Sequence, residues 1–243
     1  MNPAWTQRTE LLFGPEAVSR LLTARVAVVG LGGVGAAVAE MLARSGVGHI
    51  ALIDSDEVSE SNINRQLPAL HSTVGQPKCE VLARRLRDIN PDIDLHVVRE
   101  YLHEGNIDPV LSAFQPDRVV DAIDTLSPKI ALIQFCLKEN IPLVSSMGSG
   151  AKVDATRIRV ADISKTRMCP LAHMLIKRLH KLGISSGFTA VFSEEPPMRE
   201  SVVLEESRNK KSQVGTASWL PTVFGCVCAQ TTVCSIVGIE HNC

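Results

Sequence analysis

The feature that most constrains the fold is a glycine-rich segment, Gly30–Gly35 (GLGGVG), between a β-branched run and a helical pattern. The run before it, Arg25–Gly30 (RVAVVG), is typical of a buried strand, and Val34–Ser45 follows with a helical pattern. Its glycines permit a tight turn and close approach of the backbone to a phosphate, while the helix N-terminus offers free N–H groups. The residues expected to form this phosphate cradle are Gly30, Gly32, Gly33 and Gly35. The segment predicts a nucleotide site but does not by itself separate NAD from ATP.

The rest of the first 150 residues alternates between strand-like and helix-like runs, which predicts βαβ units around a parallel sheet. Further strands are expected at His49–Asp54, Leu95–Val98, Arg118–Ala122 and Pro142–Ser146, and helices at Lys78–Ile89 and Pro128–Glu139. The predicted fold class is α/β, a Rossmann-like doubly wound and mostly parallel sheet with a C-terminal elaboration.

After residue 150 the pattern changes. A strand is expected at Arg157–Ala161, a basic amphipathic helix at Leu171–Leu182 and a closing helix at Pro221–Val237. The polar segment Glu194–Gly215 is expected to be a mobile loop. The interpretation is one domain, 1–243, with a nucleotide-binding core in 1–150 and a substrate-binding elaboration in 151–243.

Charged and amide side chains after the second strand favour ATP over a dinucleotide. Asp54 ends that strand, where a carboxylate can bind ribose hydroxyls. Asn62 and Arg65 are three residues apart, so they lie side by side on one helical turn. Lys78 begins a helix, where the dipole disfavours a cation, so we expect it to face an anion. Arg65 and Lys78 would stabilise the charge that develops on a triphosphate.

Two acids, Asp121 and Asp124, follow the strand expected at Arg118–Ala122. Ligands of open α/β sheets bind at the carboxyl ends of the strands, where Asp124 falls. Mg²⁺ is usually held by one or two carboxylates and phosphate oxygens, so Asp124 is the expected metal ligand. Asp121 is expected to be structural.

Composition excludes several classes. A hydrophobic share of 45% and a charged share of 21% are ordinary for a globular protein. No run reaches the roughly 18 uninterrupted apolar residues of a membrane helix, and Met1–Glu10 lacks the apolar region of a secretory signal. Seven scattered cysteines favour a reduced, cytoplasmic setting. Residues 1–150 carry 13 Lys/Arg against 18 Asp/Glu and residues 151–243 carry 12 against 8, so charge alone leaves a nucleic-acid role open for the second part.

With these residues in place, the chain resembles the adenylating enzymes related to ubiquitin activation, including the sulfur-carrier activators of thiamine and molybdopterin synthesis. The matching residues, in family order, are Arg8, Gly30–Gly35, Asp54, Asn62, Arg65, Gln66, Lys78 and Asp124. The resemblance implies an ATP and Mg²⁺ site in which Asp54 holds the ribose, Asn62, Arg65 and Lys78 hold phosphates, and Asp124 holds the metal. It also implies a homodimer in which Arg8 reaches the partner's nucleotide, so Arg8, Arg65, Lys78 and Asp124 are the expected catalytic residues.

Two features narrow the branch. The two CxxC zinc pairs usual in sulfur-carrier activators are missing, and Cys226-Val227-Cys228 is only a CxC. These cysteines are better explained as buried residues on a helix face than as metal ligands. Three segments, Ser145–Gly148, Arg159–Thr166 and Val191–Pro196, resemble the tRNA threonylcarbamoyladenosine dehydratase branch instead, as does Gly46–Gly48 earlier in the chain. That branch activates the threonine carboxylate of a modified adenosine in tRNA as an acyl-adenylate and closes a ring with loss of water.

This branch implies an RNA-binding surface, for which Lys165 and Arg167 are the best candidates, and a possible sulfur-relay protein partner. Aromatic residues suited to base stacking are scarce, with Trp219 and Phe188 unplaced. Three alternatives stay open: an activator of a ubiquitin-like or sulfur-carrier protein, an NAD-dependent oxidoreductase, and a non-catalytic nucleotide-binding scaffold.

Overall fold

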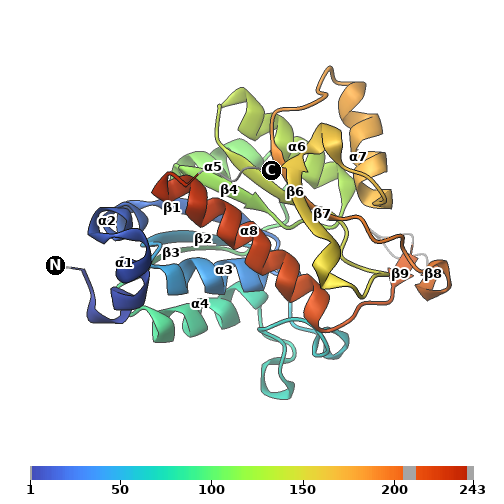
Figure 1. Ribbon diagram of the computed structural model, residues 1–243. Coiled ribbons are helices and arrows are strands. Elements are labelled where there is room, and N and C mark those ends of the chain that lie inside the picture. Colours follow the sequence, from blue (N-terminus) through green and yellow to red (C-terminus); the bar gives the residue numbers. More distant parts are fainter. Residues whose placement is uncertain (1, 205–211, 240–243) are drawn as a thin grey trace.

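A seven-stranded sheet forms the centre of the computed structural model, which describes residues 2–204 and 212–239 (Figure 1). The strand order is β3-β2-β1-β4-β5-β7-β6, and every neighbouring pair is parallel except β6 and β7. The strands are β1 Arg25–Val29, β2 His49–Ile53, β3 Asp94–Val98, β4 Arg118–Asp121, β5 Leu143–Ser146, β6 Ile158–Asp162 and β7 Thr189–Ser193. A separate antiparallel hairpin joins β8 Val202–Leu204 to β9 Ser212–Val214. The predicted α/β, mostly parallel fold class is confirmed.

Helices cover both faces of the sheet, as Figure 1 shows. One layer contains α2 Pro15–Thr23, α3 Gly33–Ser45, α4 Lys78–Ile89 and α8 Trp219–Val237; the other contains α5 Ile107–Phe114, α6 Leu126–Lys138 and α7 Pro170–His180. The first helix, α1 Gln7–Phe13, packs against α2. Short 3₁₀ turns lie at η1 Ala4–Thr6, η2 Glu60–Asn62, η3 His71–Thr73, η4 Ala155–Arg157, η5 Ile163–Lys165 and η6 Arg199–Ser201.

The strand sequences explain why the sheet is covered on both faces. Val26 and Val28 of β1 point into the core beneath α3 and α8, whereas Ala27 and Val29 point into the core beneath α5 and α6. All four side chains are buried. A parallel strand that is buried on both faces reads as a continuous apolar run, which is the pattern the sequence showed. Each buried branched side chain contributes about 1.5–3 kcal/mol to folding.

The closing helix α8 lies directly against α3 (Figure 1). Gly225 makes this approach possible, because a Cβ there would lie 2.5 Å from the Val34 carbonyl oxygen and 2.6 Å from Ala37 Cβ. By length and composition α8 could also cross a membrane, although polar residues such as Gln230 interrupt its apolar run. More than half of its apolar window is buried inside the protein, so packing on α3 and the sheet accounts for its composition.

The second part of the chain completes the sheet instead of forming a separate layer. β7 lies parallel to β5, and β6 pairs antiparallel with β7. Neither β7 nor the helices α1, α2 and α5 was predicted. The first three residues of α5 include Pro109, and the strand sequence TAVFS is too short and too evenly apolar to show an alternating pattern.

Most of the predicted strands and helices begin and end within two residues of the observed bounds. The predicted bounds of α4, Lys78–Ile89, are those observed. The loop expected over Glu194–Gly215 is partly wrong, because η6 and the two strands of the hairpin lie within it. The rest of that segment, residues 205–211, lies outside the described residues.

Candidate nucleotide and substrate site

The chain reverses direction across the sheet between β1 and β4, which are parallel neighbours although β2 and β3 separate them in sequence. Loops leaving the carboxyl ends of two such strands diverge to opposite faces of the sheet and leave a crevice, the usual ligand position in open α/β sheets. The glycine turn follows β1, and the loop that carries Asp124 follows β4. The two sequence features predicted to meet the nucleotide are therefore brought to one place.

The glycines of the turn have distinct structural reasons. Gly30 has a φ of +86°, and a Cβ there would lie 2.9 Å from the Ala122 carbonyl oxygen on the neighbouring loop. At Gly35 a Cβ would lie 1.7 Å from the Gly30 carbonyl oxygen, so only glycine lets α3 start this close to β1. At Gly32 the nearest atom to a Cβ is Gln66 Nε2 at 3.7 Å. The turn thus keeps an open face at Gly32, where a phosphate can approach the backbone.

Asp54 is held against the turn by two backbone donors. Leu31 N–H donates to Oδ2 at 2.6 Å, and Asp56 N–H donates to Oδ1 at 2.7 Å. Burial raises the pKa of the Asp54 carboxyl, and the Lys78 ammonium and both N–H donors oppose that rise. A carboxylate has about four acceptor positions, so two remain for the ribose hydroxyls that the sequence assigned to it.

Lys78 starts α4 as predicted, and its side chain is only 5% exposed. Its ammonium donates to Asp56 Oδ2 at 2.9 Å, so the anion it faces in the protein alone is a carboxylate of this chain. That carboxylate is two-thirds exposed. The arrangement fixes Lys78 close to Asp54 and leaves two of its three N–H donors for other acceptors.

Asn62, Arg65 and Gln66 share the turn that begins at η2. The N–H groups of Arg65 and Gln66 both donate to the Asn62 carbonyl, at 3.1 and 3.0 Å, so the predicted helical neighbourhood of Asn62 and Arg65 is confirmed. The Arg65 guanidinium donates to the Ser61 carbonyl and to Asn64 Oδ1. Within the described part of the chain it makes no ion pair with a carboxylate.

Gln66 supplies the observation that tests whether a ligand fits. Its Oε1 is buried and has no hydrogen-bond partner among the described residues, and its amide nitrogen faces the open side of Gly32. An unsatisfied buried oxygen costs about 1–3 kcal/mol, so such an atom beside a glycine cradle is accounted for by a ligand or its bound water. The residues present therefore fit a nucleotide in the crevice.

Asp121 and Asp124 lie in different environments. Asp121 is fully buried and forms an ion pair with Lys129, Oδ2 to Nζ 2.7 Å, while accepting the Ser145 hydroxyl at 2.6 Å. The same Lys129 ammonium donates to the Ile123 carbonyl at 2.9 Å. Asp121 is thus structural, as predicted. The exposed Asp124 follows Ile123 directly, so the buried pair fixes the backbone beside it.

The remaining predicted residues lie away from this crevice. Arg8 is exposed on α1, and Thr6, two residues earlier, contacts Gly46 at the C-terminal end of α3. Helix α3 has 13 residues, so Arg8 lies about 20 Å from the glycine turn of its own chain. Lys165 is exposed at the end of η5, and Arg167 forms an ion pair with Glu194.

No group of three or more His, Cys, Asp or Glu side chains suited to a metal occurs within residues 2–204 and 212–239. The cysteines of α8 behave as predicted for buried helix-face residues: Cys228 and Cys234 are buried, and Cys226 is half-buried. Burial raises the pKa of the Cys228 thiol to about 12, which suppresses the thiolate that a nucleophile requires.

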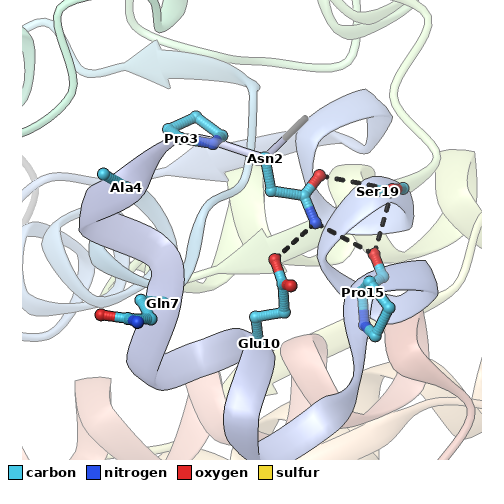
Figure 2. A pocket seen from close by; sticks show the side chains of 7 residues that line it. All are labelled: Asn2, Pro3, Ala4, Gln7, Glu10, Pro15 and Ser19. Atoms are coloured by element: carbon cyan, nitrogen blue, oxygen red, sulfur yellow. Dashed lines mark hydrogen bonds between the residues drawn. The ribbon is translucent and has the colours of Figure 1, made fainter.

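A separate hollow of about 520 Å³ lies at the N-terminus, far from the glycine turn (Figure 2). Several of its polar groups are already paired, because Asn2 Nδ2 donates to Glu10 Oε2 at 2.8 Å and to the Pro15 carbonyl, and the Ser19 hydroxyl donates to Asn2 Oδ1 and to the Pro15 carbonyl. The chemistry predicted from the sequence lies elsewhere.

Sequence reasoning missed three residues that shape the site, and it wrongly counted a fourth, the buried Lys152, among the basic residues of the second part that could contact RNA phosphates. Asp56 pairs with Lys78, and Lys129 with Asp121. Pro221 packs on Gly33, because a Cβ added at Gly33 would lie only 2.8 Å from the Pro221 Cβ. Lys152 is buried, and its ammonium donates to the Ser193 carbonyl at 2.9 Å. The sequence held one signal for the buried ion pair, which is Lys129 within the apolar run of α6, because a lysine at a buried position requires an acid partner.

Comparison with known proteins agrees with this geometry. The ThiF family matches residues 6–243. The chain is 42% identical to the tRNA threonylcarbamoyladenosine dehydratase of Bacillus subtilis over 228 residues, covering 90% of this chain and 89% of that one. The Escherichia coli enzyme of the same name is 44% identical over 182 residues, covering 74% and 68%. The crystal structure of the Escherichia coli enzyme in complex with ATP superposes with a TM-score of 0.88 at 37% identity, covering 97% of this chain and 96% of that one.

Proposed function

The chain belongs to the ThiF family, and from this premise we propose that it is an ATP-dependent tRNA threonylcarbamoyladenosine dehydratase. Two bacterial relatives of that name align over most of their length, and the ATP complex of one of them has the same fold throughout. The observation that carries the proposal is the crevice at the β1/β4 reversal, where three features converge: the open glycine turn, Asp54, and the buried Gln66 oxygen, which has no partner among the described residues.

The reaction removes one water at the expense of ATP. The threonine carboxylate of the modified adenosine attacks the α-phosphorus of ATP, and pyrophosphate leaves. The carbamoyl group of the same nucleoside then attacks the activated carbonyl and expels AMP, which keeps the carboxylate oxygen. The second step is intramolecular, so it gains from high effective molarity and requires no enzyme nucleophile. This agrees with the high pKa of the buried Cys228 thiol.

Each residue of the crevice has a proposed role. The backbone of the glycine turn and the N-terminus of α3 bind phosphate oxygens, and Asp54 accepts the ribose hydroxyls. Arg65 and Lys78 bind the phosphates and stabilise the negative charge that grows as pyrophosphate leaves. Asn62 and Gln66 are assigned to the same nucleotide, which would give Gln66 Oε1 the hydrogen-bond partner that it lacks among the described residues.

Magnesium is proposed at Asp124. A single exposed carboxylate at the carboxyl end of β4 fits Mg²⁺, which takes one or two protein carboxylates and completes its shell with water and phosphate oxygens. When bound, the ion would neutralise charge on the phosphates. The Lys129 bond to the Ile123 carbonyl holds the adjacent backbone, so the carboxylate approaches from a fixed position.

Mass spectrometry of tRNA nucleosides tests the proposal. Incubation with ATP should convert threonylcarbamoyladenosine to a product lighter by one water, with release of AMP and pyrophosphate. Arg65→Ala should slow the conversion about 100-fold or more, as loss of one charge-stabilising donor does in other enzymes. The matched control is Arg87→Ala, an exposed arginine of α4 away from the crevice. Pyrophosphate exchange that responds only to a carrier protein ending in Gly-Gly would overturn the choice of substrate.

We also propose that the protein acts as a homodimer in which Arg8 serves the partner's site. Support comes from its distance from the glycine turn and from the exposed Leu11 and Leu12 on the same helix, 76% and 74% exposed. An Arg8→Ala subunit mixed with an Arg65→Ala subunit should regain up to about a quarter of the wild-type rate, because statistical mixing gives half heterodimers with one intact site each. No recovery on mixing would contradict the shared site.

The finer assignments rest on the same reading. Lys165 and Arg167 are proposed to contact the RNA backbone; Arg167 would exchange its partner Glu194 for a phosphate. A single functional domain, 1–243, is proposed because strands from both parts of the chain form one sheet. A cytoplasmic setting is consistent with free thiols at all six described cysteines. A sulfur-relay protein partner stays a prediction from the family resemblance.

A further inference from the structure

One exposed aromatic side chain is not used by the proposed chemistry. Trp219, the first residue of α8, is 53% exposed, although a free indole of that size is normally more buried. Its Nε1–H donates to the Val153 carbonyl at 2.9 Å, so the edge of the ring is fixed while more than half of the side chain stays open to solvent. The combination indicates a built platform.

The segment that holds the indole is itself tightly fixed. Glu195 accepts the N–H groups of Val153 and Asp154 at 3.0 and 2.8 Å, and Lys152 next to them is anchored on the Ser193 carbonyl. These bonds tie residues 152–154 to the end of β7. The Val153 carbonyl therefore has little freedom, and the indole bonded to it is pre-oriented at no cost on binding.

The platform lies on the rim of the nucleotide crevice. Pro221, two residues after Trp219, packs on Gly33 at the start of α3, and Asn64 Nδ2 donates to the Thr216 carbonyl at 3.2 Å. The N-terminal end of α8 thus contacts the glycine turn, and the residues just before the helix contact the segment that carries Arg65. In Figure 1 this end of α8 points away from the N-terminus of the chain, toward the side of the molecule that carries β8 and β9.

The charge around the platform suits a polyanion. Arg157 is exposed on η4, which packs against α8, and Arg65 lies on the other side next to Asn64. Neither guanidinium forms an ion pair with a carboxylate in the described part of the chain. The nearby acids Glu195 and Asp154 keep their negative charge, but their oxygens accept hydrogen bonds from two backbone N–H groups and from the Thr156 N–H and hydroxyl.

From these observations we infer that Trp219 stacks on an unpaired base of the RNA loop that delivers the modified adenosine. The inference rests on the proposed function and extends it to a specificity-determining residue. For its carboxylate to reach the ATP α-phosphate, the nucleoside must be turned out of its loop at this rim, which leaves the flanking bases unstacked. Single-stranded bases are bound by proteins chiefly through stacking on aromatic rings beside cationic side chains.

Fluorescence gives a direct test, because the chain has only two tryptophans. In a Trp5→Phe protein, Trp219 is the sole indole, and an anticodon stem-loop carrying the modified adenosine should quench its emission. The matched Trp5→Phe/Trp219→Phe protein has no indole and gives the background signal. Absence of quenching beyond that background in the first protein would overturn the inference. Quenching by ATP alone that equals the quenching by the stem-loop would also overturn it, because the indole would then report the nucleotide and not the RNA.

Kinetics separate stacking from a merely apolar or structural role. Trp219→Ala should raise the KM for the stem-loop about 5- to 150-fold, the range measured for loss of one base stack, with the KM for ATP unchanged. Trp219→Phe should keep most of the affinity, whereas Trp219→Leu, which is apolar but has no aromatic face, should lose nearly as much as alanine. Full affinity in the leucine variant would indicate an apolar protein partner and overturn the inference.

The outcomes also separate this inference from the proposed function. If the wild-type protein dehydrates the nucleoside and Trp219→Ala binds the stem-loop normally, the stacking role is wrong and the function stands. If the wild-type protein binds the stem-loop with quenching but never dehydrates it, the proposed function is wrong. If Trp219→Ala unfolds at a lower urea concentration than the wild type, its loss of affinity is ambiguous. The phenylalanine and leucine variants and the fluorescence test then decide between the outcomes.

Discussion

Replacing Lys129 by methionine should destabilise the protein severely. The lysine is 0% exposed, and its ammonium binds Asp121 at 2.7 Å and the Ile123 carbonyl at 2.9 Å. Methionine fills a similar volume but leaves the buried Asp121 carboxylate with only the Ser145 hydroxyl and the Ile123 N–H. Breaking a buried pair by removing one partner costs about 3–5 kcal/mol. For a chain of this length that corresponds to a fall in Tm of roughly 6–20 °C.

Urea denaturation followed by circular dichroism measures this loss. The matched control is Lys138→Met on the same helix, whose side chain is 75% exposed and which should change stability by less than about 0.5 kcal/mol. The double variant with Asp121→Asn should recover much of the loss, because no buried charge is then left alone. If Lys129→Met unfolds at the same urea concentration as Lys138→Met, the pair is not a desolvated ion pair and the reasoning is wrong.

Three further predictions follow from individual contacts. Gly35→Ala places a Cβ 1.7 Å from a backbone oxygen and should cost about 3 kcal/mol or more in denaturant stability; a smaller cost would mean that the turn can relax. Burial raises the pKa of Glu40, but hydrogen bonds from Arg85 and Arg44 lower it by more, so that the pKa lies below the usual 4.5. Glu40→Gln should therefore cost about 1 kcal/mol above pH 4.5, with the difference vanishing as the pH falls through the lowered pKa; a constant difference across pH would contradict this. Asp56→Asn should release Lys78 for phosphate, so ATP should raise the Tm of this variant more than that of the wild type; a smaller rise would mean that Asp56 positions the lysine.

The sequence predicted the nucleotide half well because its signals are local. A strand, a glycine turn and a helix follow one another within residues 25–45, and the parallel order of the strands brings their carboxyl ends together whatever the details of packing. Asp54 and Gly35 could be assigned from position alone. Lys78 was expected to face an anion, but the carboxylate of Asp56 could not be foreseen, since the pairing depends on how the connecting segment folds back onto α4.

The second half was harder because its contacts are long-range. β7 was missed since its five residues are buried in the sheet between β5 and β6 and show no periodicity. The platform at Trp219 depends on Val153, 66 residues earlier in the chain, and on Glu195, which holds that segment. No window of sequence contains all three residues, so only the folded chain shows that the indole is oriented.

The contacts of α8 explain why the nucleotide and the RNA are expected to be sensed together. The same helix end presents the indole to solvent and rests Pro221 on Gly33, where no side chain would fit. Along the next turns, Gly225 lets the helix lie on the backbone of Val34. A displacement of α8 by a bound RNA must therefore be transmitted to the start of α3, which is the proposed phosphate-binding end. Close packing of this kind does not absorb shifts locally, so occupation of one side should change the affinity of the other by the same factor in both directions.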